Sequence, residues 1–459
     1  MTKSLTGKDL IDMGYKPAKW FGQVLAAANA EGLDSTAIRA MADDHAAQET
    51  KIIPPQAGLD FARFINPENE SEAENAEAVF STMTELMKTP TVVAGAVMPD
   101  ACPAGSLGTI PVGGVVSTRN AVHPGMHSAD VCCSLMTTDL GDVDPARALD
   151  VAHELCHFGP GGHRTPVDTV PEAMIDRITK NPFYTTDVAL ELARHHLRTV
   201  GASNHFVYVG RSETTGHVHL VTHHGSRGFG AHLFKNGMKV AEAFRRKHSP
   251  ETLKQNAWID LDSQEGADYM DGLAIAHDWT HLNHSSLHDA VLSALGVDGE
   301  GRLFSPHNFV FRDPKDPSVI HHAKGATPVD PDMLTDRHDT MIIPMNMAEP
   351  VLLVQPGSRN TTGFAPHGAG RVMTRTAHRK IHEGVPEEEL VARETQGIDA
   401  RFYCGIPDTS ELPSAYKSAA SVQRDMQAFG LADVVDRIMP FGCIMAGDIE
   451  RNAPWRKKP

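Results

Sequence analysis

The stretch His123-Pro-Gly-Met-His-Ser-Ala-Asp-Val-Cys-Cys-Ser134 places a carboxylate, Asp130, and a thiol, Cys133, three residues apart in a turn rich in Gly and small residues. This pairing is typical of one wall of a metal site. Further polar clusters follow along the chain, each with a His or an Asn beside a predicted strand end or a Gly-rich turn: Asn204-His205, Thr222-His223-His224-Gly-Ser-Arg227, Pro306-His307-Asn308 and His367-Gly-Ala-Gly-Arg371. We expect these clusters to supply the other walls of the site.

The patterns around the clusters predict helices and strands without a linker long enough to separate domains. Apolar residues at helical spacing predict helices near 20–28, 35–41, 74–87, 145–157, 187–200, 229–247, 268–295, 413–429 and 431–438. Strands are predicted near 91–98, 113–117, 205–209, 217–223, 308–311, 340–343 and 351–354. We therefore predict an α+β fold with mixed sheets and surrounding helices: one large domain at residues 91–459, preceded by a helical N-terminal extension at residues 1–90.

The composition narrows the class of protein. With 459 residues, 41% of them hydrophobic, the chain can bury a large core. The net charge of -16 argues against a basic coat for non-specific nucleic-acid binding, although it leaves room for a local basic groove. Six scattered cysteines suit a reducing compartment better than a disulfide framework. Because we find neither a secretory signal nor an apolar run of about 20 residues, we expect a cytoplasmic protein without a membrane span.

The candidate metal ligands are a carboxylate, a thiolate and three imidazoles: Asp130, Cys133, His205, His223 and His307. Such a set can hold one ion with a ligand to spare, or two ions bridged by the thiolate. Ligand softness alone favours Zn²⁺, whereas Mn²⁺ or iron needs geometry and supply to override the affinity order. Taken singly, each of these residues is also compatible with a buried structural role.

The His367 turn indicates anion chemistry. An imidazole nitrogen is a competent nucleophile towards phosphorus, and Gly368, Ala369 and Gly370 allow backbone N–H groups to face a phosphoryl group. Arg371 adds a planar guanidinium that suits phosphate. We therefore expect His367 to carry nucleophilic chemistry beside the metal site.

Taken in this order, the motifs resemble the RtcB family of RNA ligases. The resemblance runs from about Val97 to Gly447, and its motifs are Met98-Pro-Asp100, Gly113-Gly114, Pro124 to Cys133, Asn204-His205-Phe206, His223-His-Gly-Ser-Arg-Gly228, His307-Asn308, Lys324-Gly-Ala-Thr-Pro328, Ile343-Pro344, His367-Gly-Ala-Gly-Arg-Val-Met373 and Pro413-Ser-Ala-Tyr-Lys417. One such motif is weak, whereas ten in register are specific. The family fold is a single large α+β domain, in agreement with the pattern above.

The resemblance implies an enzyme that joins an RNA 2′,3′-cyclic phosphate or 3′-phosphate end to a 5′-hydroxyl end, with GTP and Mn²⁺ as cofactors. In the family a histidine takes the guanylate from GTP and passes it to the RNA 3′-phosphate, and the 5′-hydroxyl then displaces GMP. By motif position that histidine is His367. The implied metal ligands hold two manganese ions with Cys133 between them: Asp130, Cys133, His205, His223 and His307. The implied nucleotide-binding residues are Asn204, His205, His307, Asn308, Pro344, Met345, Asn346, Met347, His367, Gly368, Ala369 and Gly370.

The chain departs from the family pattern where the nucleotide is expected. Pro344-Met-Asn-Met-Ala348 stands in place of Pro-Gly-Ser-Met-Gly, and Val351 occupies the position of an expected Ser. The family ends in a Lys-Gly that contacts the guanylate, whereas this chain ends the motif with Ala446-Gly447. Cys102 also replaces a usual His, and Gly125-Met-His-Ser-Ala129 replaces Gly-Gly-Val-Gly-Phe. These changes leave guanine specificity open, while the metal set is complete.

Two other functions compete with ligation. A metal-dependent phosphoesterase would keep the dinuclear site and process RNA ends without a nucleotide. A non-catalytic binder of RNA ends would use the metal structurally, although an intact His367 turn argues against it. For the N-terminal segment from Leu5 to Gly22 we expect a helical cap packed on the core, with contact to an RNA stem as the alternative.

Overall fold

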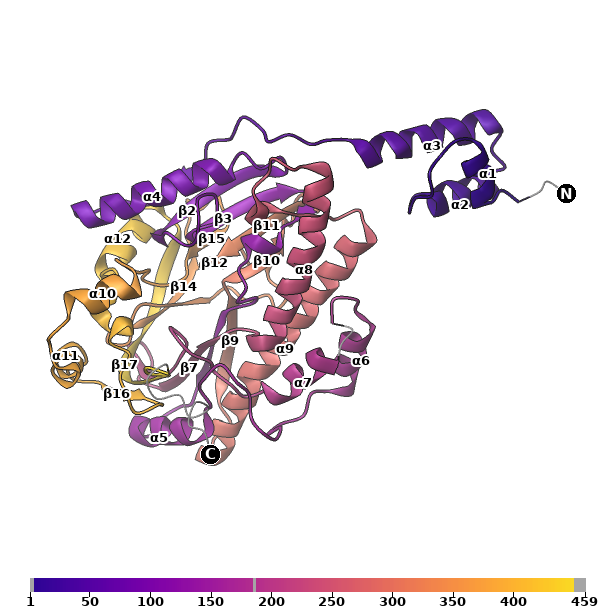
Figure 1. Cartoon of the computed structure of the whole chain (residues 1–459). Coiled ribbons are helices and arrows are strands. Elements are labelled where there is room, and N and C mark those ends of the chain that lie inside the picture. The colour runs from indigo at the N-terminus through magenta and orange to yellow at the C-terminus, as the bar shows by residue number, and fades with distance from the viewer. Residues whose placement is uncertain (1–3, 185–186, 450–459) are drawn as a thin grey trace.

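The computed structural model of the chain describes residues 4–184 and 187–449, so the predicted domain's last residues, 450–459, lie outside it. Three N-terminal helices form a small unit at one end of the molecule (Figure 1): α1 (Gly7–Asp12), α2 (Phe21–Glu31) and α3 (Ser35–Thr50). They pack Leu10, Trp20, Val24 and Ile38 against one another in a core of their own. An exposed ion pair, Lys19 with Glu265 at 3.1 Å, joins this unit to the body.

The segment after α3 is fastened to the body. The Ile53 N–H donates to the His248 carbonyl, and the Ser249 hydroxyl donates to the Ile53 carbonyl. Helix α4 (Glu70–Leu86) then lies along the body and packs on its first sheet through Val79, Met83 and Leu86. The predicted extension at residues 1–90 therefore contains two different parts: α1–α3 form their own core, whereas α4 shares the core of the body.

Two mixed sheets build the body. The first has the strand order β1 (Ala62–Arg63), β2 (Val92–Cys102), β3 (Val112–Arg119), β11 (Val319–Lys324) and β10 (Asn308–Arg312). The second has the order β13 (Met341–Pro344), β14 (Val351–Pro356), β17 (Ala432–Met445), β6 (Phe206–Ser212), β7 (Val218–His224), β5 (Ser134–Asp139) and β9 (Glu300–Pro306), with β16 (Asp399–Phe402) paired to β17. Two small pairs complete the sheets: β12 (Ala326–Pro328) with β15 (Phe364–Pro366), and β4 (Ala121–Val122) with β8 (Ile259–Asp260).

Helices cover the outer surfaces of these sheets. The longest, α9 (Gln264–Leu295), is buried along much of its length and contacts α5 (Pro145–Leu155), α8 (Arg227–His248), β5 and β7. It begins where the Ser263 hydroxyl accepts from the Gly266 N–H, and it ends at Gly296, which adopts the left-handed conformation at φ +73°. The helices of the body beyond α4 are α5 (Pro145–Leu155), α6 (Glu172–Lys180), α7 (Asp187–His195), α8 (Arg227–His248), α9 (Gln264–Leu295), α10 (Arg375–Ile381), α11 (Glu387–Glu394) and α12 (Ala419–Phe429).

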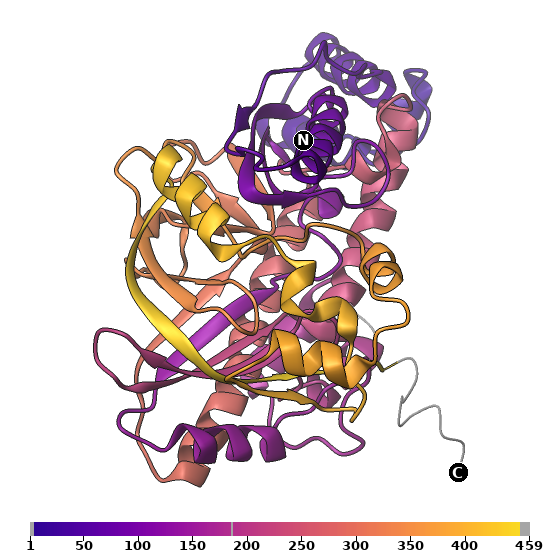
Figure 2. The same cartoon turned by 90° about the vertical axis from the view of Figure 1, so that its left-hand side faces the viewer.

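The predicted α+β class is confirmed, but one predicted helix is wrong. Within the predicted helix at 431–438, the segment from Ala432 onward belongs to β17, the long curved yellow strand in Figure 2, which pairs first with β14 and then with β6. The apolar residues in Val434-Val435 and Ile438-Met439 fit a helical spacing, yet β14 pairs along this segment and β6 joins from Ile438 onward. Tertiary pairing therefore overrides the local pattern. Among the described helices, none has the length and apolar character that crossing a membrane requires.

Candidate metal centre

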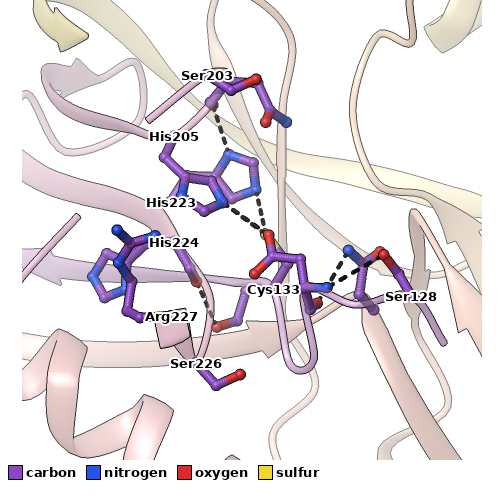
Figure 3. Close-up of polar contacts among 12 residues, drawn as sticks. Ser128, Cys133, Ser203, His205, His223, His224, Ser226 and Arg227 are labelled. Atoms are coloured by element: carbon purple, nitrogen blue, oxygen red, sulfur yellow. Dashed lines mark hydrogen bonds and ion pairs between the residues drawn. The ribbon is translucent and has the colours of Figure 1, made fainter. Parts of the chain in front are cut away.

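Four adjacent strands of the second sheet have ends that lie side by side, and these strand ends carry the predicted ligands. In the order β6-β7-β5-β9, neighbours are antiparallel, so the starts of β6 and β5 lie beside the ends of β7 and β9. Cys133 immediately precedes β5, His205 precedes β6, His223 lies at the end of β7, and His307 follows β9. Figure 3 shows His205 and His223 pointing towards the turn that carries Cys133. Segments far apart in sequence thus converge because of strand order.

The donor atoms form two groups that share one thiol. Cys133, His223 and His307 form the first group, and Asp130, Cys133 and His205 form the second, with the ligand atoms of each group within 4.8 Å of one another. The Cys133 Sγ lies 3.2 Å from His223 Nε2 and 3.5 Å from His205 Nε2. The His205 Nε2 lies 3.0 Å from an Asp130 oxygen, and the His223 and His307 Nε2 atoms are 3.2 Å apart. The geometry suits two cations bridged by Cys133.

Backbone carbonyls orient two of the imidazoles. The His205 Nδ1 lies 2.9 Å from the Val200 carbonyl, and the His223 Nδ1 lies 3.1 Å from the Asn204 carbonyl. Because a carbonyl only accepts, each Nδ1 carries a proton, and each Nε2 faces the other donor atoms of the site. The His307 Nδ1 is buried and has no hydrogen-bond partner among the described residues.

Backbone strain is concentrated around these ligands. Ser128, Cys132, Ser203 and Arg227 adopt left-handed conformations, with φ of 78°, 57°, 65° and 56°. Such angles are costly for residues other than glycine and gather at functional sites. Gly225 is required for a different reason, since a Cβ there would lie 2.3 Å from an Asp130 oxygen. The turns are therefore shaped to hold donor atoms in place.

Burial sets the protonation of the donors. It raises the pKa of Cys133 well above the usual range, and the Asp130 carboxylate raises it further, so the thiol is neutral without a cation nearby. Burial also raises the pKa of Asp130, but the neighbouring His205 and Arg227 outweigh this and lower it to about 2. For His223, burial lowers the pKa to about 3. A neutral imidazole, an ionised carboxylate and a thiol that a cation would ionise fit a divalent transition metal.

His367 lies beside this centre on the turn after β15. Its ring is 5.0 Å from the His307 ring, measured between centroids. The His367 Nδ1 lies 2.6 Å from the Oδ2 atom of the fully buried Asp100, which also accepts the N–H groups of His367 and Gly368 at 3.1 and 3.3 Å. Asp100 therefore holds the proton on Nδ1, which leaves Nε2 with a free lone pair.

One cavity of about 320 Å³ joins these groups. The predicted residues that line it are Asp130, Cys133, Asn204, His223, His307, Asn308, Pro344, Met345, Asn346, Met347, His367, Gly368, Ala369 and Gly370. His205 lies behind this surface, against Asp130 and Cys133. Asn308 also braces the site, because its Oδ1 accepts the Gly325 N–H at 2.7 Å.

Several lining residues carry charge that the site prediction did not include. Arg371 and Arg375 both bind Glu411, at 3.2 and 2.6 Å. The Lys324 ammonium donates to the Ile110 carbonyl at 3.0 Å, and burial lowers the pKa of this lysine to about 8. Asp100 and Lys324 lie in motifs that the resemblance quotes, but the sequence assigned neither of them a contact, whereas it predicted an anion contact for Arg371.

Three further buried histidines lie where β7 packs against α9, next to the strand ends that carry the candidate ligands. His224 stacks on His284 of α9, with ring centroids 3.5 Å apart. The Thr222 hydroxyl lies 2.6 Å from His284 Nδ1 and 2.9 Å from His288 Nε2. Burial lowers the pKa of all three imidazoles well below the usual range. These histidines are neutral packing groups that fix β5 and β7 against α9.

Comparison with known proteins places the chain in a family. The family model described as "tRNA-splicing ligase RtcB" matches residues 176–446, a range that includes His205, His223, His307 and His367 but not Asp100, Asp130 or Cys133. The proteins named tRNA-splicing ligase RtcB of Archaeoglobus fulgidus and Thermococcus kodakarensis are 25% and 27% identical over 305 and 301 residues. Each alignment covers 57% of this chain and 62% of the relative, so the chain spans about three-fifths of their length. With the family model matching more than half of it, the chain belongs to the RtcB family.

Proposed function

We propose that this protein is an RNA ligase that joins a 2′,3′-cyclic phosphate or 3′-phosphate end to a 5′-hydroxyl end through a nucleotide carried on His367. One observation carries the proposal: His367, with its Nδ1 bound by Asp100 at 2.6 Å, faces the same cavity as the two groups of metal donors. Family membership and the names of the relatives support RNA ends as the substrate.

The residues around His367 suit nucleotidyl transfer. Its Nε2 lone pair attacks the α-phosphate of GTP, a P–N bond forms, and the bond to the leaving pyrophosphate breaks. Asp100 stabilises the imidazole as it becomes positively charged. An oxygen of the RNA 3′-phosphate then takes the nucleotide from His367, and the 5′-hydroxyl displaces GMP from the activated end. A 2′,3′-cyclic phosphate is first hydrolysed to a 3′-phosphate in this scheme.

The cofactors of the proposal are GTP and two Mn²⁺ ions, with Zn²⁺ as the competing metal. Asp130, Cys133, His205, His223 and His307 would hold the ions, which neutralise charge on the phosphate oxygens when bound. For the nucleotide, we propose contacts from Asn204, Asn308, the loop at 344–347 and the backbone at 368–370. The lining cations Lys324 and Arg375 suit the phosphates of RNA.

The test is covalent labelling. Purified protein incubated with α-labelled GTP and Mn²⁺ should become labelled, and His367→Ala should abolish the label. His217→Ala is the matched control, because His217 is exposed and hydrogen-bonds Asp139 at 2.9 Å outside the cavity. If no nucleotide labels the protein with any divalent metal, nucleotidyl transfer through His367 is excluded.

A metal-dependent phosphoesterase is the second candidate, favoured by the fact that both donor groups are complete without His367. Such an enzyme would open an RNA cyclic phosphate without a nucleoside triphosphate. It would retain most activity in His367→Ala and lose it in Cys133→Ala. The labelling experiment and a nucleotide-free cyclic-phosphate assay therefore separate the two functions.

A further inference from the structure

One side of the cavity is built almost entirely from apolar side chains. We define the apolar wall as Phe206, Tyr208, Met347, Val351, Cys443 and Met445. All but Phe206 belong to one buried cluster, and Phe206 packs against that cluster. The wall is regular because Cys443 and Met445 of β17 stand opposite Tyr208 and Phe206 of β6 in the antiparallel register.

The apolar wall begins where the metal centre ends. Ring centroids follow one another from His367 to His307 at 5.0 Å, from His307 to His223 at 5.1 Å, and from His223 to Phe206 at 5.2 Å. This row of rings connects His367 with the apolar wall, so the base of a nucleotide bound at His367 has this wall within the same cavity. Phe206 is the first aromatic ring of the row beyond the histidines.

Two polar side chains at this side, Tyr208 and Asn346, make hydrogen bonds within the protein. The Tyr208 hydroxyl donates to the Ile438 carbonyl at 2.7 Å. In the neighbouring loop the Asn346 Nδ2 donates to Glu349 at 2.6 Å, and its Oδ1 accepts the Ala348 N–H at 3.0 Å. The charged lining residues Lys324, Arg371, Arg375 and Glu411 come from other elements, and Glu411 pairs with both arginines.

This matters because purines differ in hydrogen-bonding groups and hardly in shape. Guanine presents O6 and N2–H₂ where adenine presents N6–H₂. A site that discriminates strongly between such molecules holds polar groups that one of them leaves unpaired. Stacking on aromatic rings, in contrast, tolerates every base.

We propose that the apolar wall binds the base of the nucleotide by stacking and dispersion without reading its hydrogen-bonding edge, so that the protein accepts adenine and guanine nucleoside triphosphates alike. This inference rests on the proposed function, because it assigns the nucleotide class of the same site. Purine nucleoside triphosphates should label the protein faster than pyrimidine nucleoside triphosphates, since the larger purine rings cover more of the apolar wall.

The experiment measures the rate of adduct formation on the full chain with Mn²⁺ and each of α-labelled GTP, ATP, CTP and UTP. GTP and ATP should label at rates within about tenfold of each other, because no edge-reading group separates them. A larger preference for one purine, beyond about tenfold, would overturn the inference.

Equilibrium binding separates this inference from the proposed function. The non-reactive α,β-methylene analogues of GTP and ATP are titrated calorimetrically against the same protein. If both analogues bind equally and neither triphosphate labels the protein, ligation through His367 fails while the base tolerance stands. If GTP labels and only its analogue binds, the proposed function stands and the inference fails.

Two variants test the wall itself. Phe206→Leu removes the stacking ring and should slow labelling by GTP and ATP by the same factor, roughly tenfold, whereas an unequal loss would contradict the proposal. Met445→Gln adds an edge-reading group and should create a preference for one purine. Met439→Gln is the matched control, because Met439 lies on the same strand, is 40% exposed and is not a lining residue. Unchanged selectivity in a folded Met445→Gln protein counts against the wall as the base site.

Discussion

The two sides of the cavity are built in opposite ways. The metal centre consists of polar side chains on turns at strand ends, with strained residues such as Ser128 and Cys132 between them. The apolar wall lies mostly on the strands β6 and β17 and at the start of β14, with Met347 added from the loop between β13 and β14. Chemistry that depends on exact donor positions thus occupies irregular backbone, whereas a surface that only needs shape and area lies mostly on regular strands.

This difference predicts how amino-acid substitutions on each side of the cavity affect function. Removing one donor from the metal centre leaves other buried polar groups without a partner, which is costly. Removing one side chain from the apolar wall leaves a small void and no unpaired group. Substitutions at the metal centre should therefore abolish function, while substitutions at the wall should tune it.

A pair of cysteines gives the largest predicted contrast. Cys133→Ala removes the one donor that both metal groups share, so bound metal should fall below one ion per chain and labelling should fall by about 1000-fold or more. Cys443→Ala removes a thiol of similar burial from the apolar wall and should leave metal content intact, with labelling within about threefold and a stability loss of about 1 kcal/mol.

In both variants, elemental analysis measures the bound metal, and adduct formation with labelled GTP measures the labelling. Equal metal loss in the two proteins would show that the two sides are not separate. Full metal content in Cys133→Ala would show that the thiol is not a ligand.

The sequence predicted residues on both sides of this contrast, but not their arrangement. Asp130, Cys133, His205, His223 and His307 were selected because carboxylates, thiols and imidazoles in short motifs are chemically distinctive, and the structure brings them together. The role of Asp100 was missed, because a carboxylate that holds an imidazole 267 residues away has no local signature. The apolar wall was missed as a site, since Cys443 and Met445 look like any buried strand residues until β17 pairs with β6.

The misassigned helix at 431–438 has the same origin. Its apolar spacing fits a helix, and the identity of β17 depends on partners at residues 351–356 and 206–212. Without β17, the apolar wall loses two of its side chains, Cys443 and Met445. Local pattern therefore predicts the fold class and the ligand set, while long-range strand pairing determines how the cavity is closed.

Acid should lower the stability of the segment that carries Asp130 and Cys133, because the buried His127 lies in that segment. Burial lowers the pKa of His127 to about 4, and its ring bonds the Tyr269 hydroxyl at 2.9 Å. Between pH 6.5 and 4 the unfolded chain takes up a proton at this residue that the folded protein does not, so stability falls as pH falls through this window. The loss from His127 is about 3 kcal/mol and is complete below pH 4.

Urea unfolding at several pH values measures this effect. In His127→Gln the loss of stability between pH 6.5 and 4 should be smaller by about 3 kcal/mol. His217→Gln is the control, because the hydrogen bond to Asp139 raises the pKa of His217, so this residue favours the folded protein as pH falls and does not cause an acid loss. An unchanged acid dependence in His127→Gln would show that this imidazole does not govern the stability of the turn.

The smallest effect is expected from removing α1–α3. Neither side of the cavity uses a residue of this unit, since the described lining residues begin at Cys102. The exposed Lys19–Glu265 ion pair contributes at most about 1 kcal/mol, and the bonds of Ile53 to His248 and Ser249 remain in a chain that starts at residue 51. Nucleotide labelling by that chain should stay within about twofold of the full protein, because the core of α1–α3 is separate from that of the body. A loss of labelling beyond about tenfold would mean that this unit holds the cavity in shape, whereas unchanged labelling with weaker binding of RNA ends would assign α1–α3 to the substrate.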